Sequence, residues 1–105
     1  MKWTVEFLSE AEKDLASLDR SQQLVVLKAI DKVSENPLPR SEGGFGKPLG
    51  NHLTLKLAGC MKIKLVKQGL RVVYRIERTK TLMRIVVVSV RSDETVYRLA
   101  YHRIR

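Results

Sequence analysis

The hydrophobic and polar residues of this chain follow two spacings, one typical of helices and one typical of strands. Residues 2–7 alternate, with Trp3, Val5 and Phe7 on one face, and this alternation predicts a short first strand. Apolar residues then recur every three or four positions up to residue 35, which predicts helices. Beyond residue 50 the alternation returns, so we expect strand, helices and then a sheet.

Two consecutive helices are predicted after the first strand. Ser9 stands three residues before Glu12, as in a capping box, and begins a helix that Asp19 to Ser21 interrupt. The second helix runs from about residue 21 to 35 and ends at the Asn36-Pro37-Leu38-Pro39 segment, because proline does not continue a helix. So short a connection favours an antiparallel helical hairpin. The residues expected on the inner faces are Ala11, Leu15 and Leu18 in the first helix and Leu24, Val26, Leu27, Ile30 and Val33 in the second.

The C-terminal half alternates in the manner of β-strands. All three prolines lie in residues 37–50, together with four glycines, which predicts a long surface loop. Alternation then predicts strands at 53–57, 61–65 and 70–76, followed by a strongly apolar, central strand at 82–90. The tight turns predicted between these strands are Ala58-Gly59, residues 67–69 and residues 78–80.

A last helix is predicted from residue 93 to about residue 103, with Ser92 or Asp93 as its cap. The element order is therefore β-α-α-β-β-β-β-α. This order predicts an α+β fold, with a twisted, mostly antiparallel sheet and the helical hairpin packed on one face. With 105 residues, the chain (1–105) has room for one core and is expected to be a single domain. The inner residues expected in the last helix are Val96, Leu99 and Ala100.

The composition argues against several classes of protein. Hydrophobic residues make up 44% and charged residues 30%, which is typical of a folded globular domain. No apolar run approaches the roughly 20 residues of a membrane helix, and Glu6 interrupts the apolar start where an export signal would lie. Cys60 is the only cysteine and there are two histidines, so we expect a cytoplasmic protein with no internal disulfide, metal or cofactor.

The charge of the chain is distributed unevenly. Residues 1–50 carry seven lysines and arginines against eight acidic residues, whereas residues 51–105 carry thirteen against three, within a net charge of +9. Such a concentration favours a polyanionic partner, either a nucleic acid, an acidic protein or both. The alternative is a solvated basic face kept for solubility, which would normally mix both signs.

The alternation places several cations on one face of the predicted sheet. Lys62 and Lys64 point away from the apolar side of their strand, and Arg71 and Arg75 do so on the next strand. A two-residue turn at 67–68 pairs Lys64 with Arg71, whereas a turn one residue later shifts the partner to Val73 but keeps the cations on one face. A three-residue loop would not keep them on one face. Like charges directly opposite each other destabilise a sheet by about 0.2–1 kcal/mol. A cluster without interleaved carboxylates therefore favours anion binding over a merely solvated face.

Two further candidates follow the apolar strand. Arg91 comes directly after it, where an irregular connection can aim a long side chain. Tyr97 follows six residues later, in the last helix, and its spacing fits core packing as well as function. Arg91 is therefore a candidate for the same site, and Tyr97 stays open between the two interpretations.

Several segments of the sequence resemble the RelE family of bacterial toxins. They are Cys-Met-Lys-Ile-Lys-Leu at 60–65, Gly-Leu-Arg-Val-Val-Tyr at 69–74, the apolar run with its arginine at 86–91 and Val-Tyr at 96–97. The Lys-Pro-Leu-Gly segment at 47–50 and the paired helices extend the resemblance over the whole chain. The resemblance implies a RelE/ParE-like fold with this element order and a RelB-like antitoxin as partner. It also implies cleavage of mRNA in the ribosomal A site, leaving a 2′,3′-cyclic phosphate.

The active-site residues of that family match this chain position by position. The two strand lysines match Lys62 and Lys64, and the arginine of the following strand matches Arg71. The arginine after the apolar strand matches Arg91, and the helix tyrosine matches Tyr97. The connection before Arg91 is one residue shorter than in the prototype of the family.

These residue types suit RNA cleavage without a metal, because RNA supplies its own nucleophile, the 2′-hydroxyl. We expect Arg71 and Lys62 to stabilise negative charge on the phosphorane, and the crowded cations to leave Lys64 neutral often enough to act as general base. Arg91 would hold or protonate the leaving oxygen, and Tyr97 would stack on a base or hydrogen-bond to the hydroxyl network. The residues expected to contact RNA or the ribosome outside this set are Lys56, Lys67, Arg75, Tyr101 and Arg103.

Two other functions stay open on the sequence. The superfamily that this sequence resembles also includes ParE-like toxins. These toxins inhibit DNA gyrase and lack the complete set of basic catalytic residues. A non-cleaving RNA- or ribosome-binding domain needs the same phosphate contacts as the enzyme. Cyclic-phosphate ends on RNA would separate the enzyme from both. In each toxin interpretation, an antitoxin is expected to lay acidic side chains against the basic face.

Overall fold

The computed structural model describes residues 2–52, 55–90 and 92–104, and it has the predicted α+β architecture. The helices and strands are β1 (Thr4–Phe7), α1 (Ser9–Ala16), α2 (Arg20–Val33), β2 (Lys47–His52), β3 (Leu55–Leu65), β4 (Leu70–Glu77), β5 (Leu82–Ser89) and α3 (Asp93–Ile104). Within the described residues the strands form one sheet in the order β1-β5-β4-β3-β2. β1 pairs with β5 in parallel and the remaining neighbours are antiparallel, as predicted for a mostly antiparallel sheet.

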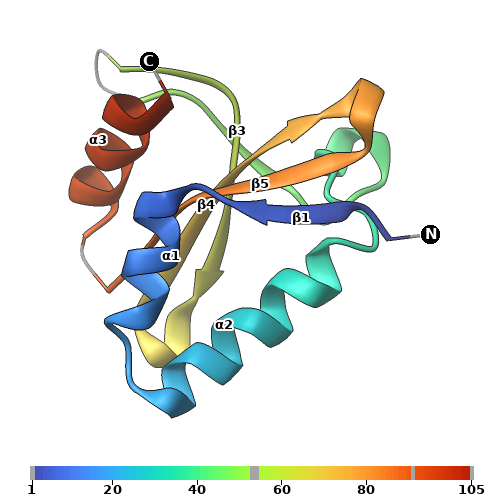
Figure 1. Cartoon of the computed structure of the whole chain (residues 1–105). Helices are drawn as coiled ribbons and strands as arrows, with labels where there is room; N and C mark the ends of the chain where they lie inside the picture. Colours follow the sequence, from blue (N-terminus) through green and yellow to red (C-terminus); the bar gives the residue numbers. More distant parts are fainter. Residues whose placement is uncertain (1, 53–54, 91, 105) are drawn as a thin grey trace.

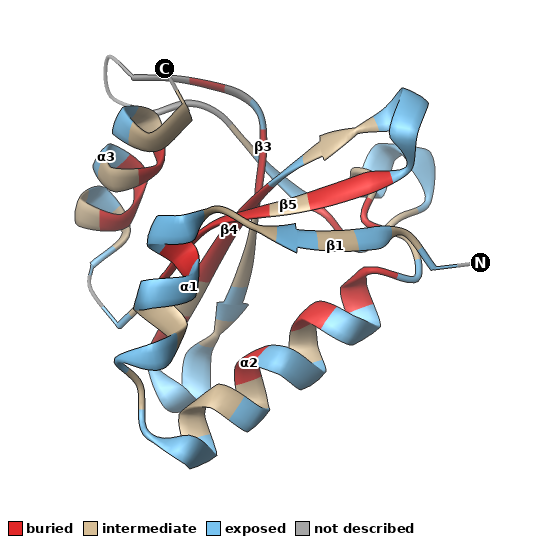
Figure 2. Ribbon diagram, viewed as in Figure 1, coloured by how far each residue is buried: buried red, intermediate tan, exposed pale blue. Residues whose placement is uncertain are grey.

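The sheet lies between two helical layers (Figure 1). On one face, α1 and α2 cover a core that includes Val26, Ile30 and Tyr74, and the two helices diverge from their short connection. On the other face, α3 covers a second core that includes Val73 and Val87. Figure 2 shows burial concentrated along β4 and β5, which have strand neighbours on both sides. The face under α3 is the face on which the sequence places the cations.

The buried stripe of α2 is narrower than the sequence predicts. Val26, Ile30 and Val33 are buried at positions i, i+4 and i+7 of one helical face. Leu24 and Leu27 were expected on the same face, but they are 55% and 42% exposed, so the prediction is wrong for these two residues. Because each residue advances a helix by about 100°, neither position is in line with the buried stripe.

The capping box belongs to the second helix and not to the first. Leu8 is the N-cap of α1, and its N–H donates to the Ile85 carbonyl of the sheet at 3.0 Å. Ser9 is therefore the first residue of the helix, and its prediction as the cap is wrong. In α2 the Asp19 carboxylate accepts from the Gln22 N–H at 2.8 Å, and the Gln22 side chain accepts from the Asp19 N–H at 3.2 Å. The residues predicted to interrupt the helices therefore begin the second one.

The second strand begins earlier than the sequence predicts. A strand is expected at 53–57 after a loop at 37–50, but β2 occupies Lys47–His52, and residues 53–54 lie outside the described residues. Pro48 obscures this strand in the sequence. Since β2 is an edge strand of the sheet, a residue without an N–H is tolerated there. Its pairing with β3 brings Lys47 into the sheet.

β3 runs without a break from Leu55 to Leu65, so the turn predicted at Ala58-Gly59 is wrong. Residues 58–60 of β3 face the single residue Leu49 of β2, which makes this point a bulge. Gly59 supplies the positive φ of 86° there, a conformation that glycine adopts without steric strain. A glycine in an alternating pattern marks a bulge as readily as a turn, and only the pairing partner distinguishes the two.

The two later turns lie where they are predicted. A 3-10 turn at Val66–Gln68 ends on Gly69 with φ 67°, and another at Arg78–Lys80 ends on Thr81 with φ 46°. These turns reverse the chain between β3 and β4 and between β4 and β5, which confirms the predicted hairpins. Within the described part of the chain, no helix is long and apolar enough to cross a membrane.

Candidate active site

The cations predicted to share one face of the sheet lie together in the structure. Lys64 pairs directly with Arg71, and Lys62 pairs with Val73. This is the register predicted for a turn at 67–68. Because alternate residues of a strand face opposite sides, the two lysines and the arginine all lie on the α3 face of the sheet.

β2 adds a lysine that the sequence prediction missed. Lys47 is the direct partner of Lys62 across the β2–β3 pair, and it is exposed. Directly paired residues of antiparallel strands project from the same face, so Lys47 joins Lys62, Lys64 and Arg71. We call these four residues the basic cluster. The Lys-Pro-Leu-Gly segment is the sequence feature that could have indicated Lys47. Because this segment was predicted to be a loop, its lysine could not be assigned to a face of the sheet.

α3 packs Tyr97 against the basic cluster. Tyr97 is only 3% exposed and belongs to the core that also contains Val73 and Ala100. The Lys62 ammonium donates a hydrogen bond to the Tyr97 hydroxyl at 3.3 Å and lies 5.9 Å from the centre of its ring. A ring buried this deeply has no face available for stacking on a base, so of the two expected roles the hydrogen-bonding one fits. Tyr97 is therefore both a core residue and a neighbour of the candidate site.

A carboxylate lies among these cations, contrary to the expectation of none. The Arg71 guanidinium donates through Nε to Asp93, and Lys64 Nζ lies 3.4 Å from Asp93 Oδ2. Desolvation acts to raise the pKa of Asp93, but the hydrogen bond and charge of Arg71 together with Lys64 outweigh it, so the pKa is lowered. From the sequence, Asp93 was considered only as a helix cap. Its position two residues after Arg91, a predicted site residue, is the sequence feature that could have indicated that Asp93 lies at the site.

The other predicted RNA contacts lie outside the basic cluster. Lys67 is exposed in the turn between β3 and β4. Arg75 is exposed on β4, four residues beyond Arg71 and therefore about 13 Å away along the strand. Tyr101 is half-buried against the core under α3. The predicted site residues that lie outside the description are Arg91 as a whole and the side chain of Lys56.

Arg103, also expected to contact RNA, is turned into the protein. Its guanidinium donates to the Asp14 carboxylate at 2.6 Å and to the Val86 carbonyl at 2.8 Å, and its side chain is 14% exposed. The same carboxylate accepts from the Val88 N–H at 3.0 Å. These bonds join α1, β5 and α3. Arg103 therefore holds α3, the helix that carries Tyr97, against the sheet.

Replacing Asp14 with alanine is expected to lower the free energy of unfolding by about 2–4 kcal/mol, because it leaves the mostly buried Arg103 guanidinium without its carboxylate. Urea denaturation followed by circular dichroism measures the loss. Asp31→Ala is a matched control. Asp31 pairs with Lys2 at the surface, with side-chain exposures of 66% and 53%, so its replacement is expected to cost much less stability than that of Asp14. Equal losses in the two variants would contradict the structural role.

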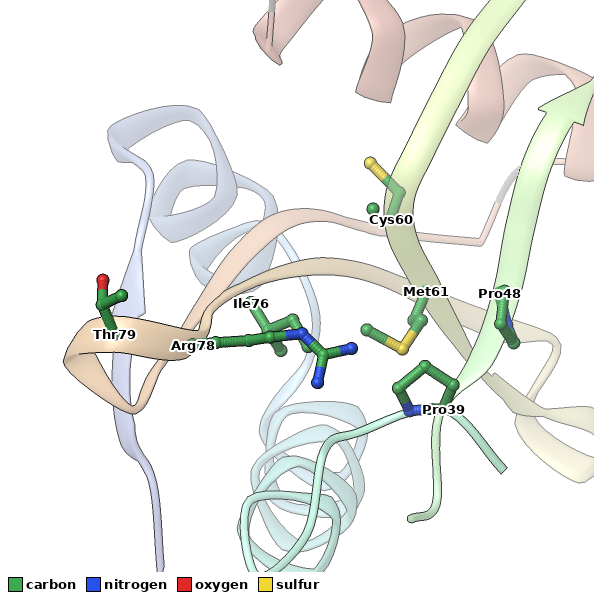
Figure 3. Close-up of a pocket in the computed structure, with 8 residues that line it drawn as sticks. Pro39, Pro48, Cys60, Met61, Ile76, Arg78 and Thr79 are labelled. Atoms are coloured by element: carbon green, nitrogen blue, oxygen red, sulfur yellow. The ribbon is translucent and has the colours of Figure 1, made fainter. Parts of the chain in front are cut away.

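The candidate site is shallow: Lys64 and Arg71 line only a small hollow of about 70 Å³. A mainly apolar cavity of about 330 Å³ lies elsewhere, lined in part by Pro39, Met61 and Arg78 (Figure 3). Arg78 extends along it and forms a bidentate ion pair with Glu42, at 2.6 and 2.7 Å. Among the described residues that line this cavity, none belongs to the basic cluster. The described residues also contain no group of three or more His, Cys, Asp or Glu side chains that could hold a metal ion.

Comparisons with known proteins place the chain in a family. No family model matches the sequence. A RelE-like toxin protein of Escherichia coli is 31% identical over 109 residues, covering all of both chains. An arginine-substituted form of the E. coli toxin RelE in the free state superposes over all of both chains, with a TM-score of 0.76 and 26% identity. A chain of the RelBE toxin–antitoxin complex from Mycobacterium tuberculosis matches 87% of this chain and 100% of its own length, with a TM-score of 0.69 and 30% identity. The similarity in sequence over the full length, together with the shared fold, means that this chain belongs to the RelE family of toxins.

Proposed function

We propose that this chain is the toxin of a type II toxin–antitoxin system and cleaves mRNA in the ribosomal A site. In the reaction, the 2′-hydroxyl loses its proton to water and attacks the adjacent phosphate, so that a 2′,3′-cyclic phosphate forms as the bond from phosphorus to the 5′-oxygen breaks. The 5′-oxygen of the next nucleotide leaves as a hydroxyl after it takes up a proton from Arg91 or from water. The observation that carries the proposal is the basic cluster on the α3 face, with Lys62 hydrogen-bonded to Tyr97. Such a protein acts in the cytoplasm, where its substrate is.

The charge of the transition state accounts for the composition of the site. Negative charge builds up on the phosphate oxygens as the phosphorane forms, and preorganised donors stabilise it more than they stabilise the ground state. Arg71 offers a planar guanidinium suited to two phosphate oxygens, and Lys62 offers an ammonium whose position is set by the Tyr97 hydroxyl. We assign stabilisation of the phosphorane to Arg71 and Lys62. Tyr97 acts as a positioning residue for Lys62.

Lys64 is assigned to phosphate binding and no longer to proton abstraction. Its expected role as a base depended on neighbouring cations with no compensating charge. Asp93 supplies such a charge at 3.4 Å in the free protein, so that premise does not hold there. Arg91 keeps its proposed role at the leaving oxygen, since it follows the end of β5 by two residues in the sequence. The ribosome supplies the remaining rate enhancement by aligning the RNA. Reacting groups that are already held in line lose less entropy on reaching the transition state, so the barrier is lower.

An antitoxin is the second proposed partner. The M. tuberculosis chain to which this chain is similar comes from a RelBE toxin–antitoxin complex. In the present chain, residues 51–105 carry thirteen basic and three acidic residues. An antitoxin segment with acidic side chains would complement this surface and compete with RNA for it.

Primer extension on an mRNA in a purified translation system tests the proposal. We expect cuts within A-site codons that require ribosomes, and 5′ fragments that end in a cyclic phosphate. Intact mRNA at doses that arrest growth would overturn the proposal and direct attention to DNA gyrase, which a supercoiling assay measures. RNA that is bound but remains intact would indicate a binding domain without nuclease activity.

A further inference from the structure

Asp93 interacts with the two cations of the basic cluster that pair across β3 and β4. Its carboxylate accepts from the Arg71 guanidinium and lies 3.4 Å from the Lys64 ammonium. The Asp93 side chain is 36% exposed and the Arg71 side chain 24% exposed, so the contact lies at the accessible rim of the site. An anionic group of the protein thus occupies the place where these cations would hold a phosphate.

The helix does not need this carboxylate as its cap. Ser92 has that role, because its hydroxyl accepts from the Thr95 N–H at 3.4 Å and its carbonyl accepts from the Val96 N–H at 3.0 Å. Of the two caps that the sequence allows, Ser92 is the one observed. The Asp93 side chain can therefore leave the cations while the backbone of α3 stays in place. Since a partly exposed ion pair contributes only modestly to stability, a phosphate can displace Asp93, but the displacement lowers the affinity for RNA.

Carboxylate and phosphate compete for the same donors. Both accept charge-assisted hydrogen bonds from a guanidinium, and both lie favourably beside an ammonium. A phosphate that enters between Lys64 and Arg71 must displace Asp93, and it must then remain near a second negative charge. Lys47 and Lys62 form the other side of the cluster, and neither has an ion pair with an acidic side chain within the described part of the chain.

We propose that Asp93 is a specificity-determining residue, which closes the Lys64–Arg71 side of the site in the free protein and is exchanged for an RNA phosphate in the bound state. The inference builds on the proposed function and deepens it. Short, free RNA gains only its own phosphate contacts and competes poorly with Asp93. RNA held in place by a ribosome has already lost its translational freedom, so it displaces the carboxylate more readily. Asp93 thereby restricts the enzyme to positioned RNA.

The test measures binding of a short, fully 2′-O-methylated RNA, which cannot be cleaved, by fluorescence anisotropy over a range of salt concentrations. Wild-type protein is compared with Asp93→Asn and with Glu94→Gln. Glu94 is the matched control, because it is the neighbouring acidic residue in the first turn of α3 and forms its ion pair with Arg98 instead. Asp93→Ser serves as a second variant that removes the carboxylate and keeps a residue suited to a helix start.

Asp93→Asn and Asp93→Ser are expected to bind the RNA about five- to tenfold more tightly than the wild type, as removal of a negative charge beside a bound phosphate implies. The dependence of log K on log salt is expected to become steeper by about 0.7, the value for one additional phosphate on a single strand. Glu94→Gln is expected to stay within about twofold of the wild type.

Two results would overturn the inference. If the Asp93 variants bind no more tightly than Glu94→Gln, the carboxylate does not compete with phosphate. If they bind more weakly, Asp93 positions Arg71 for RNA and does not exclude it. Binding of a non-cleavable RNA requires no catalysis, so this outcome is separate from that of the proposed function. The proposed function itself fails when wild-type protein leaves ribosome-bound mRNA intact.

Discussion

Replacing Arg71 with alanine is expected to reduce ribosome-dependent mRNA cleavage by about 10²–10³-fold, the usual effect of removing one preorganised donor to a developing oxyanion. Arg71 is the guanidinium of the basic cluster, and it is paired across the sheet with Lys64. Single-turnover cleavage on programmed ribosomes measures the loss in the chemical step directly. Arg71→Lys is expected to retain part of the activity, because an ammonium keeps the charge but lacks the planar fork that matches two phosphate oxygens.

Arg84→Ala is the matched control for this prediction. Arg84 lies on β5 and forms ion pairs with Glu77 at 2.8 Å and Glu6 at 3.5 Å, away from the basic cluster. Its replacement removes one arginine and one ion-paired charge, as the replacement of Arg71 does. We expect cleavage by this variant to stay within about threefold of the wild type. If both variants lost activity to the same extent, net positive charge and not a specific contact would account for the effect.

Replacing Lys62 with alanine is expected to reduce cleavage by about 10²-fold, because its ammonium is the second group assigned to the phosphorane. Tyr97→Phe removes only the hydroxyl that receives the Lys62 hydrogen bond at 3.3 Å, and we expect a loss of about tenfold. The two residues act through one contact, so the effect of Tyr97→Phe should nearly disappear in the Lys62→Ala background. A double-mutant cycle on single-turnover rates measures this coupling.

Additive losses in that cycle would mean that Tyr97 contacts the RNA itself and does not act through Lys62. Thermal unfolding of Tyr97→Phe is the necessary companion measurement, because the ring is 3% exposed and belongs to the core under α3. Phenylalanine keeps the buried ring, so the variant should remain folded. A rate loss at unchanged stability then reports on the hydroxyl alone.

The sequence predicted the faces of the strands well because the side-chain period of a strand is two. Lys62 and Lys64 were placed on one face with Arg71 from alternation alone, and the observed register agrees with the turn at 67–68. Positions near glycine and proline were predicted less well. Gly59 lies at a bulge in a continuous β3, and Pro48 lies in an edge strand. The presence of glycine or proline in the sequence therefore did not distinguish a turn from an irregularity in strand pairing.

The sequence by itself therefore determined the element order, the face on which the cations lie and the concentration of charge in the second half of the chain. Only the tertiary structure decided how α3 sits on that face. Its packing buries Tyr97 beside Lys62 and brings Asp93 between Lys64 and Arg71. Periodicity is a local property, whereas these contacts join residues 22 to 35 positions apart in the chain. Contacts of that kind depend on how whole elements pack, and no pattern within a single element encodes them.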